Sequence, residues 1–138
     1  MTMLTPVLAL IVWTLVVWIW MYAKRIPAMQ KAKIKPDDAI HPGSLSVLPS
    51  DARAVADNYN HLHEQPTIFY ALATYSFLVG VGDGLNIALA WGYVTLRVVH
   101  SLIQIVARKV MPRFMVFAAA SVLLMIIAAR NVFALLAV

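Results

Sequence analysis

The sequence contains no cysteine and little charge, and both shortages narrow what the protein can be. Without cysteine it has no disulfide, no thiolate ligand and no thiol nucleophile, so any sulfur chemistry depends on the thiol of a ligand. Charged residues are only 12% of the 138 residues, whereas they make up about a quarter of a soluble domain. Hydrophobic residues reach 62% and the mean hydropathy is +0.81, which excludes a soluble domain and indicates an integral membrane protein.

Apolar runs separated by polar segments predict four membrane-spanning helices. We expect these helices at residues 4–23, 50–79, 85–107 and 114–136. The segment between the first two contains prolines that predict no long helix there, namely Pro27, Pro36, Pro42 and Pro49. The second helix starts at Ser50 or Asp51, and its polar first half is expected to project toward the headgroups and the cytosol. We therefore predict one all-α domain over residues 1–138, a four-helix transmembrane bundle.

Basic residues predict the orientation in the membrane. Of the 11 lysines and arginines, all but Arg97 and Arg130 fall in segments on one side of the predicted bundle. That side is expected to face the cytosol, with both termini on the opposite side. The net charge of +5 is then a topology signal, and no motif supports binding of nucleic acid. Arg130, near the far end of the last span, is expected to extend to the interface or to pack between subunits.

The glycine-rich turn at residues 80–84 predicts the depth of the polar residues. Such a short turn joins antiparallel helices, so residues equally distant from Asp83 lie at equal height. Arg97 then faces Phe69, and Glu64 lies within about a turn and a half of it. A charged arginine inside a span is costly, so we expect Glu64 to be its partner.

Helical periodicity places polar residues on two faces. One face of the second helix carries Arg53, Asp57, Asn60 and Glu64, with His61 and His63 on its flanks. One face of the third helix carries Tyr93, Arg97, His100 and Gln104. If these faces meet, they enclose a polar, basic cavity capped by Arg113 that suits a small anionic ligand.

Structural roles remain open for the same residues. Arg97 with Glu64 can equally be an ion pair that holds two helices together, and His100 can be a neutral hydrogen-bonding residue of the core. Asp57, His61 and Glu64 share a helix face but lack further ligands at a distance in the sequence, so we predict no metal site.

Several segments, in this order, resemble the MAPEG family, the membrane-associated proteins in eicosanoid and glutathione metabolism. They are residues 25–28 (RIPA), 58–70 (NYNHLHEQPTIFY), 97–101 (RVVHS) and 112–113 (PR). The resemblance covers nearly the whole chain. It implies a left-handed four-helix bundle that assembles as a homotrimer and binds glutathione between subunits, toward the cytosolic side.

The resemblance also implies roles for single residues. Arg113 matches the arginine that stabilises the glutathione thiolate, and is the catalytic candidate. The candidates for binding glutathione are Arg25, Arg53, Asn60, His63, Glu64, Arg97, His100 and Gln104. Family enzymes usually have a glutamate three residues after the asparagine that matches Asn60. Here His63 occupies that spacing and Glu64 comes one residue later, so either of the two can take the acidic position of the second helix. Gln104 is a departure, since family enzymes commonly have a tyrosine there and an amide cannot replace a phenol.

We therefore expect a glutathione-dependent transferase or peroxidase that attacks a lipophilic electrophile or hydroperoxide arriving from the lipid bilayer. The short connections resemble bacterial members of the family, which implies the bacterial plasma (inner) membrane. One alternative is a non-catalytic protein of the same fold that binds a small anionic or lipid ligand. A small four-span transporter is another, but Glu64 lies near the cytosolic edge and not at the midplane, where coupling sites occur.

Overall fold

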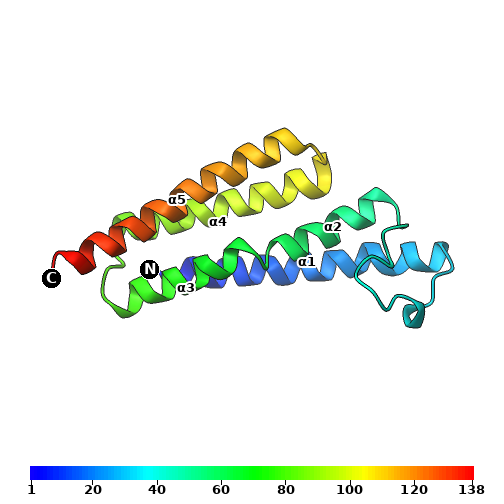
Figure 1. Ribbon diagram of the computed structural model, residues 1–138, viewed down its shortest axis with the longest axis horizontal. Helices are drawn as coiled ribbons and strands as arrows, with labels where there is room; N and C mark the ends of the chain where they lie inside the picture. Colours follow the sequence, from blue (N-terminus) through cyan, green and yellow to red (C-terminus); the bar gives the residue numbers. More distant parts are fainter.

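Helices account for all regular secondary structure in the computed structural model, which describes residues 1–138 (Figure 1). The five α-helices are α1 (Leu4–Lys31), α2 (Ser50–His61), α3 (Gln65–Leu78), α4 (Gly84–Leu102) and α5 (Val110–Leu136). A short 3₁₀ helix, η1 (Pro36–Asp38), lies in the first connection, and a π-helical turn, η2 (Ile103–Ala107), continues α4. The all-helical fold predicted from the sequence is confirmed.

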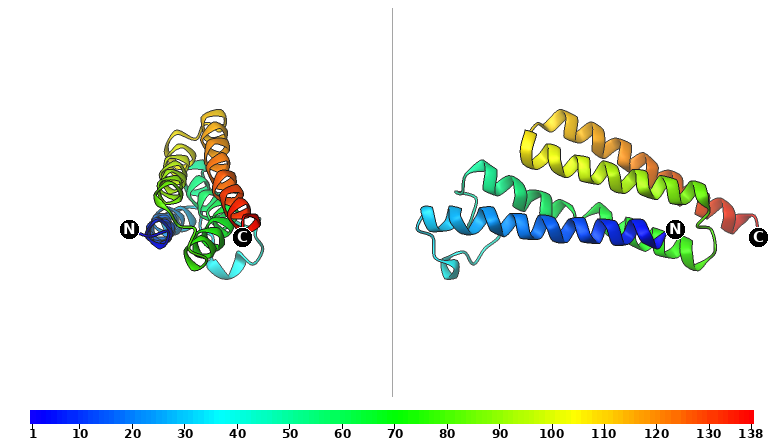
Figure 2. Two further views of the ribbon diagram at one scale, coloured as in Figure 1. Left: turned by 90° about the vertical axis from the view of Figure 1, so that its left-hand side faces the viewer. Right: turned by 180° about the vertical axis from the view of Figure 1, so that it is seen from behind.

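The helices form two antiparallel pairs. Helices α2 and α3 follow one another alongside α1, and α5 returns along α4 (Figures 1 and 2). The most extensive contacts join α4 to α5 and α1 to α2. Both termini lie at the end that holds the α3–α4 turn, and residues 32–49 project from the opposite end. Three segments are long and apolar enough to cross a membrane, namely Leu4–Lys31, Gly84–Ala107 and Val110–Leu136.

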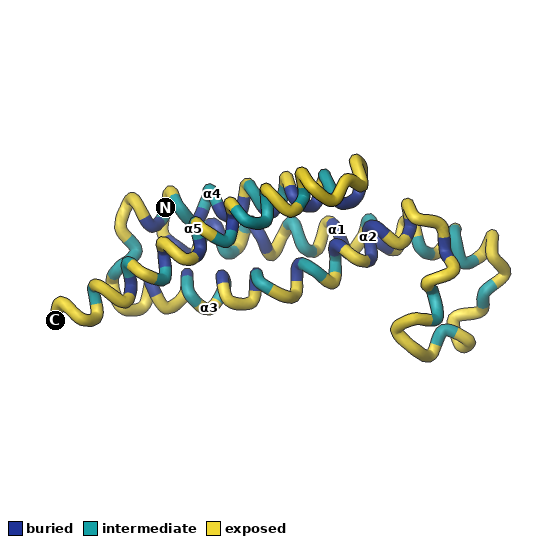
Figure 3. Tube along the Cα trace, turned by 45° about the horizontal axis from the view of Figure 1, so that its top comes forward, coloured by how far each residue is buried: buried dark blue, intermediate teal, exposed yellow.

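Buried residues line the inner faces of the helices, whereas the outer faces are exposed (Figure 3). The core contains Phe69 on α3 and Tyr93 on α4, whose rings stack with centroids 4.6 Å apart. Large apolar side chains cover much of the exposed surface, including Ile19, Met125 and Phe133. An apolar exterior around a partly polar interior suits a bundle surrounded by lipid.

The prediction that α1 ends before Pro27 was wrong. The helix runs through Pro27 to Lys31. A proline removes one backbone hydrogen bond, and in this helix that loss does not end the hydrogen-bond pattern. The helix ends where Lys33 takes a left-handed conformation, with φ of 58°. The backbone N–H of Ile34 then donates to the carbonyl of Met29 over 3.0 Å, which is the bond of a Schellman C-cap.

The predicted helix over residues 50–79 is broken into two. Helix α2 ends at His61 and α3 begins at Gln65, directly before Pro66. Pro66 has no N–H to donate and restricts the backbone of the residue before it, so the helical hydrogen-bond pattern stops. The hydroxyl of Thr67 donates to the carbonyl of Glu64 over 2.7 Å and satisfies one of the exposed groups at the break.

The depth prediction centred on Asp83 was wrong by about one helical turn. Tyr93, not Arg97, lies opposite Phe69, and the Tyr93 hydroxyl donates to Oε1 of Gln65 over 3.1 Å. The reason is that α3 ends at Leu78 and α4 begins at Gly84, so the midpoint of the connection is Val81. Asp83 belongs to the start of α4, where its carboxylate accepts the N–H of Asn86 over 2.9 Å.

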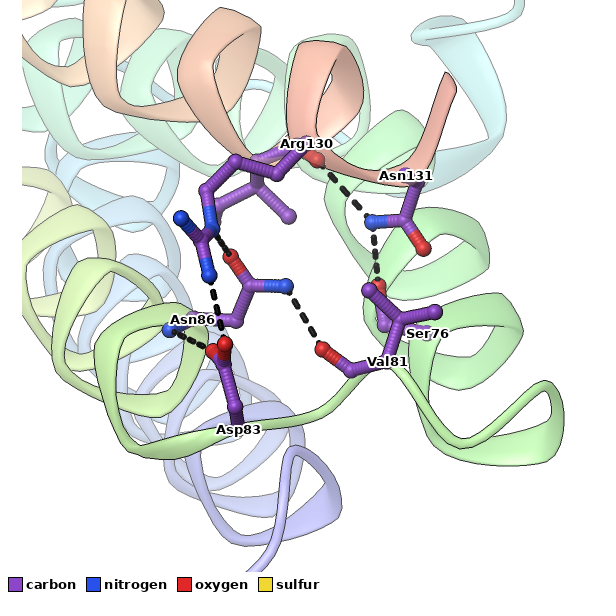
Figure 4. Close-up of polar contacts among 7 residues, drawn as sticks. Ser76, Val81, Asp83, Asn86, Arg130 and Asn131 are labelled. Carbon is purple, nitrogen blue, oxygen red and sulfur yellow. Dashed lines mark hydrogen bonds and ion pairs between the residues drawn. The ribbon is translucent and has the colours of Figure 1, made fainter. Parts of the chain in front are cut away.

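Arg130 lies in a polar cluster at this end of the bundle, together with Asp83 and Asn86 (Figure 4). Its guanidinium forms an ion pair with Asp83, and its Nε donates to Oδ1 of Asn86 over 2.7 Å. The side chain of Asn86 is fully buried and also donates to the carbonyl of Val81 over 2.7 Å. The cluster therefore ties α5 to the turn that precedes α4.

Candidate functional site

Three adjacent cavities lie at the end of the bundle opposite the termini. The loop cavity, of about 170 Å³, is lined by Arg25, Pro42, Leu45, Ser46, Leu48, Ala52, Arg53, Ala56, Asp57 and Asn60. The arginine cavity, of about 250 Å³, is lined by Ser50, Arg53, Ala54, Asp57, Gln104, Arg108 and Arg113. The histidine cavity, of about 190 Å³, is lined by His61, His100, Val110, Arg113, Phe114 and Phe117.

Shared residues connect the three cavities in a row. Arg53 and Asp57 line both the loop cavity and the arginine cavity. Arg113 lines both the arginine cavity and the histidine cavity. The row therefore runs from the end of α1, across the exposed face of α2, to the start of α5.

The side chains that line this row are mostly basic, with one acidic residue among them. Arg53, Asp57 and Asn60 are exposed at spacings of four and three residues on α2, so the helix presents them on one face. Arg25, Arg108 and Arg113 approach from other elements. Asp57 is the only acidic side chain that lines the row. This arrangement suits a ligand that carries more than one anionic group and a single cationic group.

The π-helical turn η2 brings two further side chains to the arginine cavity. Its last backbone bond joins the N–H of Arg108 to the carbonyl of Ile103 over 2.6 Å, and Arg108 takes a left-handed conformation with φ of 55°. Gln104 lies within the turn, and its Oε1 accepts from Nδ2 of the fully buried Asn58 over 2.9 Å. This bond leaves the amide nitrogen of Gln104 free to donate to a ligand.

Arg97 lies behind the histidine cavity and is 0% exposed. Its Nη2 donates to Nδ1 of His61 over 2.7 Å, whereas Nε and Nη1 have no partner. The expected ion pair with Glu64 is absent, and the Glu64 side chain is exposed. The only ion pair in the structure is the one between Arg130 and Asp83. Arg97 is thus a buried cation without an acidic partner, which is rare unless a ligand supplies the negative charge.

Two imidazoles share the wall of the histidine cavity. The rings of His61 and His100 stack with centroids 4.7 Å apart and planes inclined by 11°, and Phe117 packs edge-on against His61. His61 ends α2, outside the three apolar helices. Burial, and then the neighbouring Arg97 guanidinium, lower the pKa of the His61 imidazole below its ordinary value of 6.5. The ring is therefore neutral at physiological pH.

The structure brings most of the predicted site residues together. Those that line the row of cavities are Arg25, Arg53, Asn60, His100, Gln104 and Arg113. Arg97 contacts the row through its bond to His61 and lies over the ring of Phe117, with Cζ 5.9 Å from the ring centroid. His63 and Glu64 are exposed and line none of the three cavities.

Four residues were missed as site candidates. Asp57 and His61 were placed on or beside the correct helix face, but Glu64 was preferred as the acidic residue. Arg108 was interpreted only as a topology signal, and the partner of Gln104, Asn58, had no periodic signal of its own. Glu64 follows the end of α2 and is exposed, and the bond from Arg97 goes to His61, the last residue of that helix. No group of three or more potential metal ligands comes together.

Three helices long and apolar enough to cross a membrane define a multi-pass helical membrane protein, with a basic row of cavities at one end. The sequence matches the model of the MAPEG family over residues 3–133, and the protein belongs to that family. The resemblance seen in the sequence is thereby confirmed. No match was found among curated proteins or among solved structures.

Proposed function

We propose that this protein is a membrane-bound glutathione-dependent transferase or peroxidase. The observation that carries the proposal is the row of cavities, in which arginines surround a single carboxylate and lead to a chamber with an apolar wall. Glutathione has two carboxylates, one ammonium group and a thiol, with a net charge of about −1 at neutral pH from its group pKa values. The cavity lining matches this set of groups in number and sign.

Arg25 and Arg53 bind one carboxylate, and Asp57 accepts hydrogen bonds from the ammonium group. Asn60 and Gln104 bind the peptide amides. Arg108 binds the second carboxylate at the far side of the arginine cavity. These assignments place the thiol near Arg113, where the arginine cavity meets the histidine cavity.

Arg113 activates the thiol in this proposal. A free cysteine thiol has a pKa of about 8.5, and an adjacent guanidinium stabilises the thiolate and lowers that pKa. The thiolate then attacks an electrophilic carbon and forms an S–C bond, or attacks a peroxide oxygen and breaks the O–O bond. The protein needs no nucleophile of its own, which agrees with the absence of cysteine.

The second substrate is a lipophile that arrives from the bilayer. Val110, Phe114 and Phe117 form the α5 wall of the histidine cavity, and the first two are 67% and 60% exposed on the outside of the bundle. An apolar molecule dissolved in lipid can therefore reach the sulfur without crossing the basic part of the row.

The proposal includes assembly and location. We propose a homotrimer in the bacterial plasma membrane, with both termini away from the cytosol and the row of cavities toward it. The basic residues of the row and the lysines at 31, 33 and 35 all lie at the end opposite the termini, as the positive-inside rule favours.

Glutathione binding to the detergent-solubilised protein tests the proposal. The unfolding temperature should rise with glutathione concentration, corresponding to about 2.7 kcal/mol at a hundred times Kd. Arg113→Ala should keep most of this rise but lose conjugation of a chlorodinitrobenzene acceptor. Lys109→Ala, which removes a neighbouring charge that lines none of the three cavities, is the matched control and should retain both the rise and the conjugation.

One observation favours a second candidate, a non-catalytic protein that binds a small anionic or lipid ligand. Gln104 has no phenol, and its carbonyl is already held by Asn58. A folded protein whose unfolding temperature does not respond to glutathione would favour this candidate over the transferase.

A further inference from the structure

We propose that His61 donates a hydrogen bond to the sulfur of the bound thiol, and that Arg97 is the positioning residue that keeps His61 in the donating tautomer. The inference rests on the proposed function and assigns the group that shares the thiolate with Arg113. It also gives a role to a buried arginine that the ligand cannot touch.

The hydrogen bond between the two side chains determines where the proton of His61 lies. A guanidinium has only donors, so Nδ1 of His61 must accept the bond of 2.7 Å from Nη2 of Arg97. The ring proton is therefore on Nε2. This nitrogen has no partner within the protein and is not buried, and the side chain lines the histidine cavity. Nε2–H is a donor available to a ligand in that cavity.

The buried charge of Arg97 favours an anion at the same place. Two of its nitrogens, Nε and Nη1, have no partner, and no carboxylate contacts it. Because Arg97 is fully buried, the accessible end of the bonded pair is Nε2 of His61. A cation bound to one side of an imidazole polarises the ring and strengthens the donor on the other side. The effect of the Arg97 charge thus reaches the cavity through His61.

Arg113 completes the place for the sulfur. It lines the same cavity from α5, so Arg113 and His61 approach it from two walls. The other titratable groups near His61 are His100, which stacks on its ring, and Glu64, which follows α2. Neither makes a hydrogen bond to the imidazole ring of His61.

This geometry restricts what His61 can do. Its Nδ1 lone pair is occupied by Arg97 and its Nε2 already carries a proton, so it does not accept the proton of the thiol. The S–H bond breaks with transfer of its proton to water, and the resulting thiolate accepts hydrogen bonds from His61 and Arg113. His61 is therefore a donor that stabilises the anion and not a general base.

The test is an ultraviolet titration of the thiolate of bound glutathione, which needs no acceptor substrate. His61→Phe keeps a ring stacked on His100 and removes the donor, so the pKa of the bound thiol should rise by about one unit, a tenfold loss of thiolate near neutral pH. Arg97→Met should give a similar rise. In the double variant, the pKa of the bound thiol should be no higher than in either single variant, because both substitutions remove the same hydrogen-bonded unit.

Two further variants make the result specific. His61→Gln should retain most of the shift, since its amide can accept from Arg97 and donate to sulfur. His41→Phe changes an exposed histidine of the first connection and should leave the thiol pKa as in the wild type.

The outcomes separate the two proposals. If wild-type protein does not bind glutathione, the proposed function and this inference both fail. If glutathione binds but His61→Phe leaves its thiol pKa unchanged, only the role of His61 is refuted. If the effects of His61→Phe and Arg97→Met add in the double variant, Arg97 acts independently and the positioning role is wrong.

Discussion

Replacing Asn86 by alanine should loosen the end of the bundle that lies farthest from the cavities. The buried Asn86 amide accepts from Nε of Arg130 and donates to the carbonyl of Val81, each over 2.7 Å (Figure 4). Alanine removes both bonds and leaves the Val81 carbonyl without this donor.

The magnitude follows from these two bonds. A hydrogen bond to a charged group contributes about 1.5–3 kcal/mol and a neutral one about 1 kcal/mol. Arg130 is partly exposed and retains its ion pair with Asp83, so the first contribution belongs at the low end. We expect Asn86→Ala to destabilise the protein by roughly 2–3 kcal/mol. For a chain of this length, that corresponds to a fall of about 7–10 °C in the unfolding midpoint.

The assay is thermal unfolding in detergent, followed by tryptophan fluorescence at one fixed scan rate. Thr95→Ala is the control on the same helix, because Thr95 is exposed and its hydroxyl bonds only the carbonyl of Trp91 one turn earlier. The unfolding midpoint of this variant should move by less than about 2 °C. Glutathione binding should be unchanged in Asn86→Ala, since the cavities lie at the other end. A midpoint within 2 °C of the wild type would refute the reasoning that this cluster fastens α5 to the turn.

Three more predictions concern the core, the acid stability and the ligand. Phe69→Ala removes a fully buried ring stacked on Tyr93 and should cost about 3–5 kcal/mol, measured by the same unfolding assay. The unfolding midpoint should fall as the pH drops below about 6.5, because the unfolded chain protonates His61 at its ordinary pKa whereas the folded protein keeps it neutral; His61→Phe should show a smaller fall. Arg53→Gln should weaken glutathione binding about tenfold, because Arg53 lines two of the three cavities; an unchanged Kd by calorimetry would remove it from the site.

The sequence predicted the helical class and both polar faces, because apolar length and helical spacing are local properties. Tyr93, Arg97 and His100 of α4 and Gln104 of η2 are all buried, as one face predicts. The exposed face of α2 likewise lines the cavities. Periodicity was enough for residues within one helix, such as Arg53, Asp57 and Asn60 of α2, but it also placed on their face Glu64, which lies beyond the end of that helix.

The partner of Arg97 could not be predicted in this way. With the midpoint of the α3–α4 connection at Val81, depth alone places Arg97 level with Gln65, next to Glu64. The structure instead leaves Glu64 exposed beyond the end of α2, and Arg97 bonds the neutral ring of His61. At Pro27 the prediction failed in the opposite way, because a helix end was expected there but the helix continues. Its end is set by the left-handed conformation of Lys33.

The length of α1 has a consequence for how two unlike reactants meet. Its 28 residues span about 42 Å, whereas the hydrocarbon core of a bilayer is about 30 Å thick. A span that begins near Leu4 would leave about two turns of α1, which include Arg25, beyond the hydrocarbon core and beside the loop cavity. Under the proposed function, a polar peptide would bind there from the aqueous phase while a lipophile approaches α5 from the membrane. The two reactants would therefore arrive through separate openings and would not compete for one.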